Sequence, residues 1–171
     1  MPLSHRRRTI RATTVTLLML GGAGGLAAQT SDAVNHVTWN ADTHTATLEL
    51  IAGPFMFLNA TEGSATFTVP ANATVVINFV NKDGVPHSAE IIPGEGPIPN
   101  AATDPAIPRA YTTKVMEGLP QEAGDVMKFT APASGKYRIF CGVPGHGLSG
   151  MWFWMNVDST AKAASFGPTP S

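Results

Sequence analysis

The residues most able to do chemistry in this chain lie in one loop near its C-terminal end. The only cysteine, Cys141, is followed by His146 and then by Met151, with four residues between each pair. A further histidine, His87, lies upstream in the segment VPHS. A thiolate, two imidazoles and a weak axial thioether are the donors that proteins use to hold a single copper ion for electron transfer. The four residues therefore predict a mononuclear copper centre.

Glycine and proline shape this loop, which runs from Phe140 to Met151 as FCGVPGHGLSGM. Glycine permits a positive φ and close approach of the backbone, whereas proline fixes φ and stiffens the turn. The loop can therefore present its three donor side chains together. Pro144 has no amide hydrogen, which leaves the amide of Val143 as the candidate donor to the sulfur. Hydrogen bonds of this kind tune the reduction potential of a bound metal.

Three further sequence motifs accompany the ligands: CGVPGHG inside the loop, GMWFW after it, and NKDGVPHS around His87. With these motifs, the chain from about Asn59 to Val157 resembles the single-domain blue copper proteins, the cupredoxins. Within them it most resembles the sulfocyanin and rusticyanin group. The resemblance implies a Greek-key β-sandwich and one type 1 copper ion per chain. Its expected ligands are His87, Cys141, His146 and Met151.

The resemblance also implies roles for the neighbours of the ligands. Many cupredoxins carry asparagine after the first ligand histidine, and this chain has Ser88 there, which we expect to brace the loop. The imidazole edge of His146 is the expected electron port, surrounded by Pro144, Gly145 and Leu148.

Alternating apolar and polar residues, separated by turn signals, predict an all-β sandwich with a single domain. Side chains of a strand alternate between its two faces. This parity places Cys141 on the apolar face of its strand and Met151 on the face shared with Phe153, so both ends of the loop should enter the core. The expected strands are 46–50, 67–69, 75–80, 89–92, 126–130, 136–141 and 151–157.

Four segments are expected along the 171 residues. Residues 1–28 are basic, then apolar, and end in small residues, which predicts an export signal peptide or an N-terminal anchor. Residues 29–58 should supply N-terminal strands of the domain, and residues 59–157 the blue copper core. Residues 158–171 are small, polar and proline-bearing, which predicts a flexible tail.

The other histidine and methionine residues considered as ligands are expected to lie outside the metal site. His36 and His44 lie in polar surroundings and are expected to face solvent, while Met56 and Met155 are weaker axial candidates that we expect to pack in the core. Residues 94–125 are rich in proline and glycine. They are expected to form an ordered excursion, because long unstructured connections are uncommon inside compact domains.

Without residues 1–28, seven basic residues remain against twelve acidic ones, a net charge near −5. This domain lacks the basic surface that nucleic-acid binding requires. A single cysteine also excludes an internal disulfide. We expect an exported monomer, periplasmic or extracytoplasmic, either free or tethered to the membrane by its N-terminal segment. Its expected partners are redox proteins such as a cytochrome or a terminal oxidase.

The expected function is one-electron transfer rather than enzymatic catalysis, because no second cluster of catalytic or metal-binding residues accompanies the four ligands. Copper delivery or storage is the alternative, although such carriers tend to use exposed, exchangeable ligands. A multicopper or nitrite-reducing enzyme would need further histidine clusters and further domains. A hydrolase with Cys141 as nucleophile, and His87 or His146 as base, would be expected to place the cysteine at a helix N-terminus.

Overall fold

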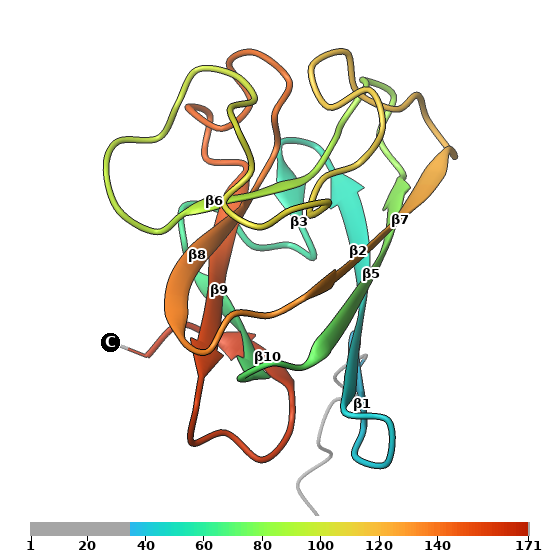
Figure 1. Cartoon of the computed structure of the whole chain (residues 1–171). Helices are drawn as coiled ribbons and strands as arrows, with labels where there is room; N and C mark the ends of the chain where they lie inside the picture. Colours follow the sequence, from blue (N-terminus) through green and yellow to red (C-terminus); the bar gives the residue numbers. More distant parts are fainter. Residues whose placement is uncertain (1–34, 171) are drawn as a thin grey trace, which may run out of the picture. The chain divides into compact units, whose positions relative to one another are not determined.

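The computed structural model of the chain describes residues 35–170, so the predicted export signal lies outside the described residues. Within this part of the chain every regular element is a strand, and the strands form two five-stranded sheets that face each other (Figure 1). The all-β prediction is confirmed. The strands are β1 (Val37–Asn40), β2 (Thr45–Gly53), β3 (Met56–Phe57), β4 (Ala65–Pro70), β5 (Thr74–Asn81), β6 (Glu90–Pro93), β7 (Gly124–Thr130), β8 (Gly135–Phe140), β9 (Trp152–Asp158) and β10 (Ser165–Pro168).

The two sheets are interleaved along the sequence. One sheet has the order β1-β2-β5-β7, with β3 paired to β2, and the other has the order β10-β4-β9-β8-β6. Two pairs are parallel, β2 with β5 and β4 with β9, while the remaining pairs are antiparallel. The chain therefore crosses between the sheets instead of running as simple hairpins, which gives the expected Greek-key sandwich.

The core lies between the sheets and follows the period of two expected of strands. In β5 every second residue is buried, beginning with Val75, and in β9 the same holds from Phe153 onward. Cys141 and Met151, at the two ends of the predicted site loop, are both fully buried within this core cluster. The parity argument is therefore confirmed for both residues.

The excursion between β6 and β7 is ordered, as expected, and packs on the rest of the domain. The amide of Ala102 donates to the carbonyl of Gly142 (2.8 Å), and the amide of Thr112 donates to Ala89 (2.8 Å). A turn occupies residues 113–117. These bonds fix the excursion against the site loop and against the start of β6.

The prediction of a flexible tail over residues 158–171 is wrong for residues 165–168, which form β10 at the edge of the second sheet. Phe166 packs edge-on against Phe153, with 5.3 Å between ring centroids. The hydroxyl of Thr169 donates to the carbonyl of Gly63 (2.6 Å). This segment is ordered by partners elsewhere in the chain, which its own composition does not reveal.

Three long connections and one tight turn gather at one end of the sandwich (Figure 1). They are the loop between β8 and β9, the connection between β5 and β6, the excursion between β6 and β7, and the turn between β2 and β3. The predicted site residues therefore come from connections that meet at the same end.

Among residues 35–170 the structure shows no helix with the length and apolar character that a membrane span requires.

Candidate metal centre

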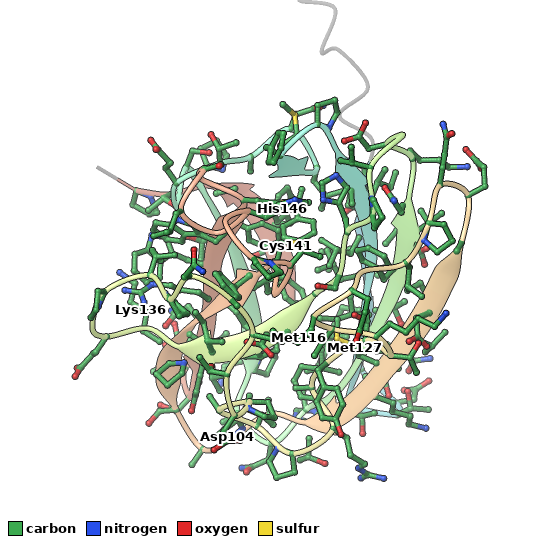
Figure 2. All side chains as sticks on the ribbon, turned by 90° about the horizontal axis from the view of Figure 1, so that it is seen from above. Asp104, Met116, Met127, Lys136, Cys141 and His146 are labelled. Carbon is green, nitrogen blue, oxygen red and sulfur yellow. The ribbon has the colours of Figure 1, made fainter. Side chains whose placement is uncertain are left out.

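Three donor atoms meet at this end of the sandwich. The Nδ1 atoms of His87 and His146 are 3.1 Å apart, and the Sγ atom of Cys141 lies 4.0 Å from the first and 3.5 Å from the second. Figure 2, which looks onto this end, shows Cys141 and His146 beside each other. His87 and Cys141 are fully buried and His146 is half-buried, so the cluster lies just below the surface.

The loop between β8 and β9 is held by its own backbone. The amide of Cys141 donates to the carbonyl of Met151 (3.1 Å), and the amide of Met151 donates to the carbonyl of His146 (3.1 Å). The thioether-bearing residue is thus tied through its main chain to both loop donors. Gly147 has no room for a side chain, because an added Cβ atom would lie 1.9 Å from the ring of Phe140. Tight packing therefore selects glycine here.

His87 reaches the cluster from the connection between β5 and β6. Its backbone exchanges two hydrogen bonds with Leu119 in the excursion, at 3.2 and 2.8 Å. Gly118 has a φ of +77°, and an added Cβ atom there would lie 2.8 Å from Pro86. The excursion thus fixes the backbone that carries His87, which gives a structural role to a segment whose role the sequence did not assign.

Ser88 links three connections around the sulfur. Its hydroxyl donates to the carbonyl of Val115 (2.7 Å) and accepts the amide of Gly142 (3.1 Å), and its oxygen lies 3.9 Å from Sγ of Cys141. Burial raises the pKa of the Cys141 thiol, while hydrogen bonds from the amides of Ser88 and Val143 act in the opposite direction. Without a metal the thiol is therefore held protonated.

The surroundings of His146 are largely apolar. Burial lowers the pKa of His146, and the neighbouring imidazole of His87 lowers it further. Pro144 and Leu148 are exposed beside it, and Gly145 is half-buried. The ring is thus partly open to solvent at a surface of mixed, mainly apolar, character.

Two residues of the site were not predicted from the sequence. The ring of Phe55, in the turn between β2 and β3, meets His146 edge-on with 4.9 Å between centroids. A carboxylate oxygen of Asp83 lies 2.9 Å from Nε2 of His87. Phe55 approaches only through the fold, whereas the position of Asp83 four residues before His87 is a signal that could have been noticed.

Other candidate ligands lie elsewhere. His44 is exposed in the turn between β1 and β2, where Nε2 lies 3.1 Å from the carbonyl of Ala71. His36 is half-buried and packs edge-on against Phe166. Met155 is fully buried in the core. Among the described residues, the cluster of possible metal-binding side chains comprises His87, Cys141 and His146.

The donor set fits a first-row metal ion. Bonds of about 2.0 Å to nitrogen and about 2.3 Å to sulfur, in a trigonal arrangement, would separate the donors by about 3.5 to 3.7 Å. The observed separations of 3.1, 3.5 and 4.0 Å bracket that range. Two imidazoles and one thiolate, with a methionine on the same loop, are the donors typical of blue copper sites.

Fold and site together define a cupredoxin, a blue copper protein. The solved structures similar to the chain include reduced auracyanin from Roseiflexus castenholzii, 26% identical with a TM-score of 0.51 over 66% of this chain and 96% of that one. Auracyanin A from Chloroflexus aurantiacus, a blue copper protein, is 26% identical with a TM-score of 0.51 over 67% and 99% of the two chains. The copper protein rusticyanin shares the fold, at 24% identity and a TM-score of 0.50 over 72% and 88%.

The match to a sequence family is more specific than the similarity of fold. Residues 32–166 match the sulfocyanin (SoxE) domain, and the chain belongs to that family. A curated relative, sulfocyanin of Sulfolobus acidocaldarius, is 29% identical over 108 residues, which cover 57% of this chain and 53% of the relative. The chain thus spans about half the length of that relative. Cupredoxins bind type 1 copper and generally transfer electrons, and His87, Cys141 and His146 form the candidate copper site here.

Proposed function

We propose that this chain is an exported mononuclear type 1 copper protein that carries single electrons between redox partners. The observation that carries the proposal is the convergence of two Nδ1 atoms and one Sγ atom within 4.0 Å of one another. In the proposed site His87, Cys141 and His146 are the three strong ligands, and Met151 is the weak axial ligand. The complete burial of Met151 and its backbone bonds to Cys141 and His146 support its assignment.

The protein's contribution is to hold the donors in place. A bound copper ion supplies the exchange of one electron between its two oxidation states. Ser88 and the amide of Val143 stabilise the sulfur, and Pro144 leaves that side of the loop without a competing donor. The backbone hydrogen bonds that join the two ends of the loop would hold Cys141, His146 and Met151 in place in either oxidation state of a bound ion. Burial of Cys141 and His87 would keep water away from a bound ion.

Electrons are proposed to enter and leave through the exposed edge of His146, beside Pro144, Gly145 and Leu148. Four exposed apolar side chains, which we call the apolar rim, lie in the connections at this end of the sandwich. Weak, short-lived docking of redox proteins, such as a cytochrome or a terminal oxidase, suits such a surface. The rim consists of Phe55, Val85, Met116 and Leu148, which are 42%, 41%, 44% and 60% exposed.

The proposal includes the location of the protein and the organisation of its segments. The basic and then apolar pattern of residues 1–28 supports export to the periplasm or another extracytoplasmic space, with either cleavage or retention as a tether. The described part of the segment 29–58 belongs to the same domain as 59–157 in this proposal, which is supported by the pairing of β2 with β5. We propose a monomeric carrier without enzymatic activity.

The test is the spectrum of the copper-loaded protein. The oxidised wild-type protein should be intensely blue and should lose its colour reversibly on one-electron reduction, because a thiolate bonded to copper gives this signature. The variants Cys141→Ser and His87→Ala should lose it. His44→Ala, which removes an exposed histidine outside the cluster, should keep it. Visible and electron paramagnetic resonance spectra, recorded with a redox titration, measure these outcomes.

A colourless protein loaded with Cu(II) would contradict the proposal. Rapid loss of copper to a weak chelator, together with a redox-silent bound form, would instead indicate copper delivery or storage. The burial of Cys141 and His87 argues against that alternative, because exchangeable sites present their donors to solvent.

A further inference from the structure

A carboxylate contacts the proposed ligand His87 from the side opposite the other donors. Oδ2 of Asp83 lies 2.9 Å from Nε2 of His87. The side chain of His87 is fully buried, and that of Asp83 is 19% exposed. The contact is therefore largely shielded from water, which strengthens its electrostatic effect.

The two ring nitrogens of His87 have separate partners. Nδ1 faces Nδ1 of His146 and Sγ of Cys141, so it is the atom available to a metal. A neutral imidazole carries its single hydrogen on one nitrogen and accepts with the other. Because Nε2 faces a carboxylate, which only accepts, the hydrogen is on Nε2 and is donated to Asp83. The contact thus fixes the tautomer that leaves Nδ1 free.

The carboxylate is itself held in place by the end of β5. The fully buried Asn81 accepts the amide of Asp83 (2.9 Å) and donates to the carbonyls of Val85 (2.8 Å) and Leu119 (2.9 Å). The amide of Gly84 donates to the second carboxylate oxygen, Oδ1, at 2.7 Å. Both oxygens of Asp83 are therefore positioned by the fold.

The charge of Asp83 is directed at His87. In the described part of the chain, the basic side chain that Asp83 contacts is that of His87, and the neighbouring Lys82 pairs with Glu122 instead. Because Oδ2 of Asp83 faces Nε2 of His87 and Oδ1 accepts the amide of Gly84, the carboxylate charge lies directly behind the imidazole. An ionised carboxylate behind an imidazole makes that imidazole a stronger metal donor.

We propose that Asp83 is a positioning residue that orients His87 and lowers the reduction potential of the copper site. This role rests on the proposed copper function. The negative charge favours Cu(II) over Cu(I), because the more highly charged ion is attracted more strongly. Removing the charge should therefore weaken binding of Cu(II) more than binding of Cu(I).

Asp83→Asn tests this role, since it keeps the size of the side chain and removes the charge. Cu(II) affinity should fall by about 10- to 100-fold, the usual effect of removing a partner of a metal-bound histidine. The potential should rise by about 59 mV for each tenfold loss of Cu(II) affinity relative to Cu(I). Asp42→Asn removes an exposed acid in the turn between β1 and β2 and should leave both quantities unchanged.

A second measurement needs neither copper nor a variant. Nitrogen-15 resonances of the metal-free wild-type protein at neutral pH should show His87 with its hydrogen on Nε2. Hydrogen on Nδ1 would overturn the proposal even if Asp83→Asn failed to fold. A potential in Asp83→Asn equal to that of Asp42→Asn would also overturn it. A wild-type protein that is not blue would instead refute the proposed function, and the tautomer would still be decided independently.

Discussion

At the scale of single residues, burial gives acidic and basic side chains roles that depend on pH. Glu90, at the start of β6, is almost completely buried, and one of its oxygens accepts the amide of Thr103 (3.0 Å). Burial raises the pKa of Glu90 above its usual value. The folded protein therefore binds this proton more tightly than the unfolded chain does.

The raised pKa of Glu90 should make the folded protein less stable as the pH rises. The contribution of protonated Glu90 is fully present below the pKa of the unfolded chain, about 4.3. It is lost as the pH rises through the higher pKa of the folded protein. Glu90→Gln should match the wild-type free energy of unfolding at acidic pH and exceed it at pH 8. Urea denaturation of the metal-free protein across this range measures the difference.

Glu95→Gln is the matched control, because Glu95 is exposed on the adjacent loop and loses the same charge. Its stability should follow that of the wild type at every pH. If Glu90→Gln also showed the wild-type pH dependence, burial of this carboxyl group would not control it.

The candidate ligands were predictable from the sequence because three of them lie within eleven residues of one loop, where spacing alone limits the geometry. Asp83 and Phe55 were not predicted. The role of Asp83 depends on which nitrogen of His87 faces the cluster, and that orientation is set by packing. Phe55 reaches His146 only because β2 and β3 end at the same edge of the molecule as the loop.

At the scale of elements, seven strands were predicted from alternation, and each corresponds to a strand of the structure. Strands were expected within residues 29–58 but β1 and β3 were given no bounds, and β10 was not predicted. β3 has only two residues, and β10 has the sequence SFGP, which contains little that favours a strand. Such segments become strands because a neighbouring strand offers its free edge, and that partner is distant in the sequence.

The contribution of β10 can be measured by truncation. Removing residues 165–171 would uncover the edge of β4 and expose the face of Phe153 that Phe166 covers. The free energy of unfolding should fall by about 2 kcal/mol, the usual value for one large apolar side chain removed from contact. The spectrum of the copper-loaded protein should not change, because β10 contributes no proposed ligand.

Removing only residues 170–171, which follow the last pair of the ladder, serves as the control and should cost much less. An equal loss of stability in both truncations would show that the pairing of β10 with β4 contributes little. Denaturant unfolding, followed by tryptophan fluorescence, distinguishes the two results.

At the scale of the whole molecule, four connections build the proposed electron port at one end of the sandwich (Figure 1). Two copies of the protein, one oxidised and one reduced, should exchange electrons through these ends. Leu148→Asp places a charge in the apolar rim and should slow this self-exchange by about tenfold, equivalent to about 1.4 kcal/mol, through repulsion and desolvation. Broadening of nuclear magnetic resonance lines in mixtures of the two forms measures the rate.

Val126→Asp provides the matched control, because Val126 is also 60% exposed but lies on β7, outside the rim. It adds the same charge and should leave the rate almost unchanged. Equal slowing by both variants would mean that net charge, rather than the rim, governs the approach of the two copies.

The parallel pairing of β4 with β9 bears on how the protein is made. Thr66 lies opposite Trp154, so β4 cannot complete its pairing before β9, which lies far along the sequence, is available. Such distant pairings form late, because a long stretch of polypeptide must first be brought together. The site loop directly precedes β9, so the chain's only thiol stays open to oxidants for the same interval. His87 and Cys141 come from different connections and meet only in the closed sandwich, so metal loading belongs after that step.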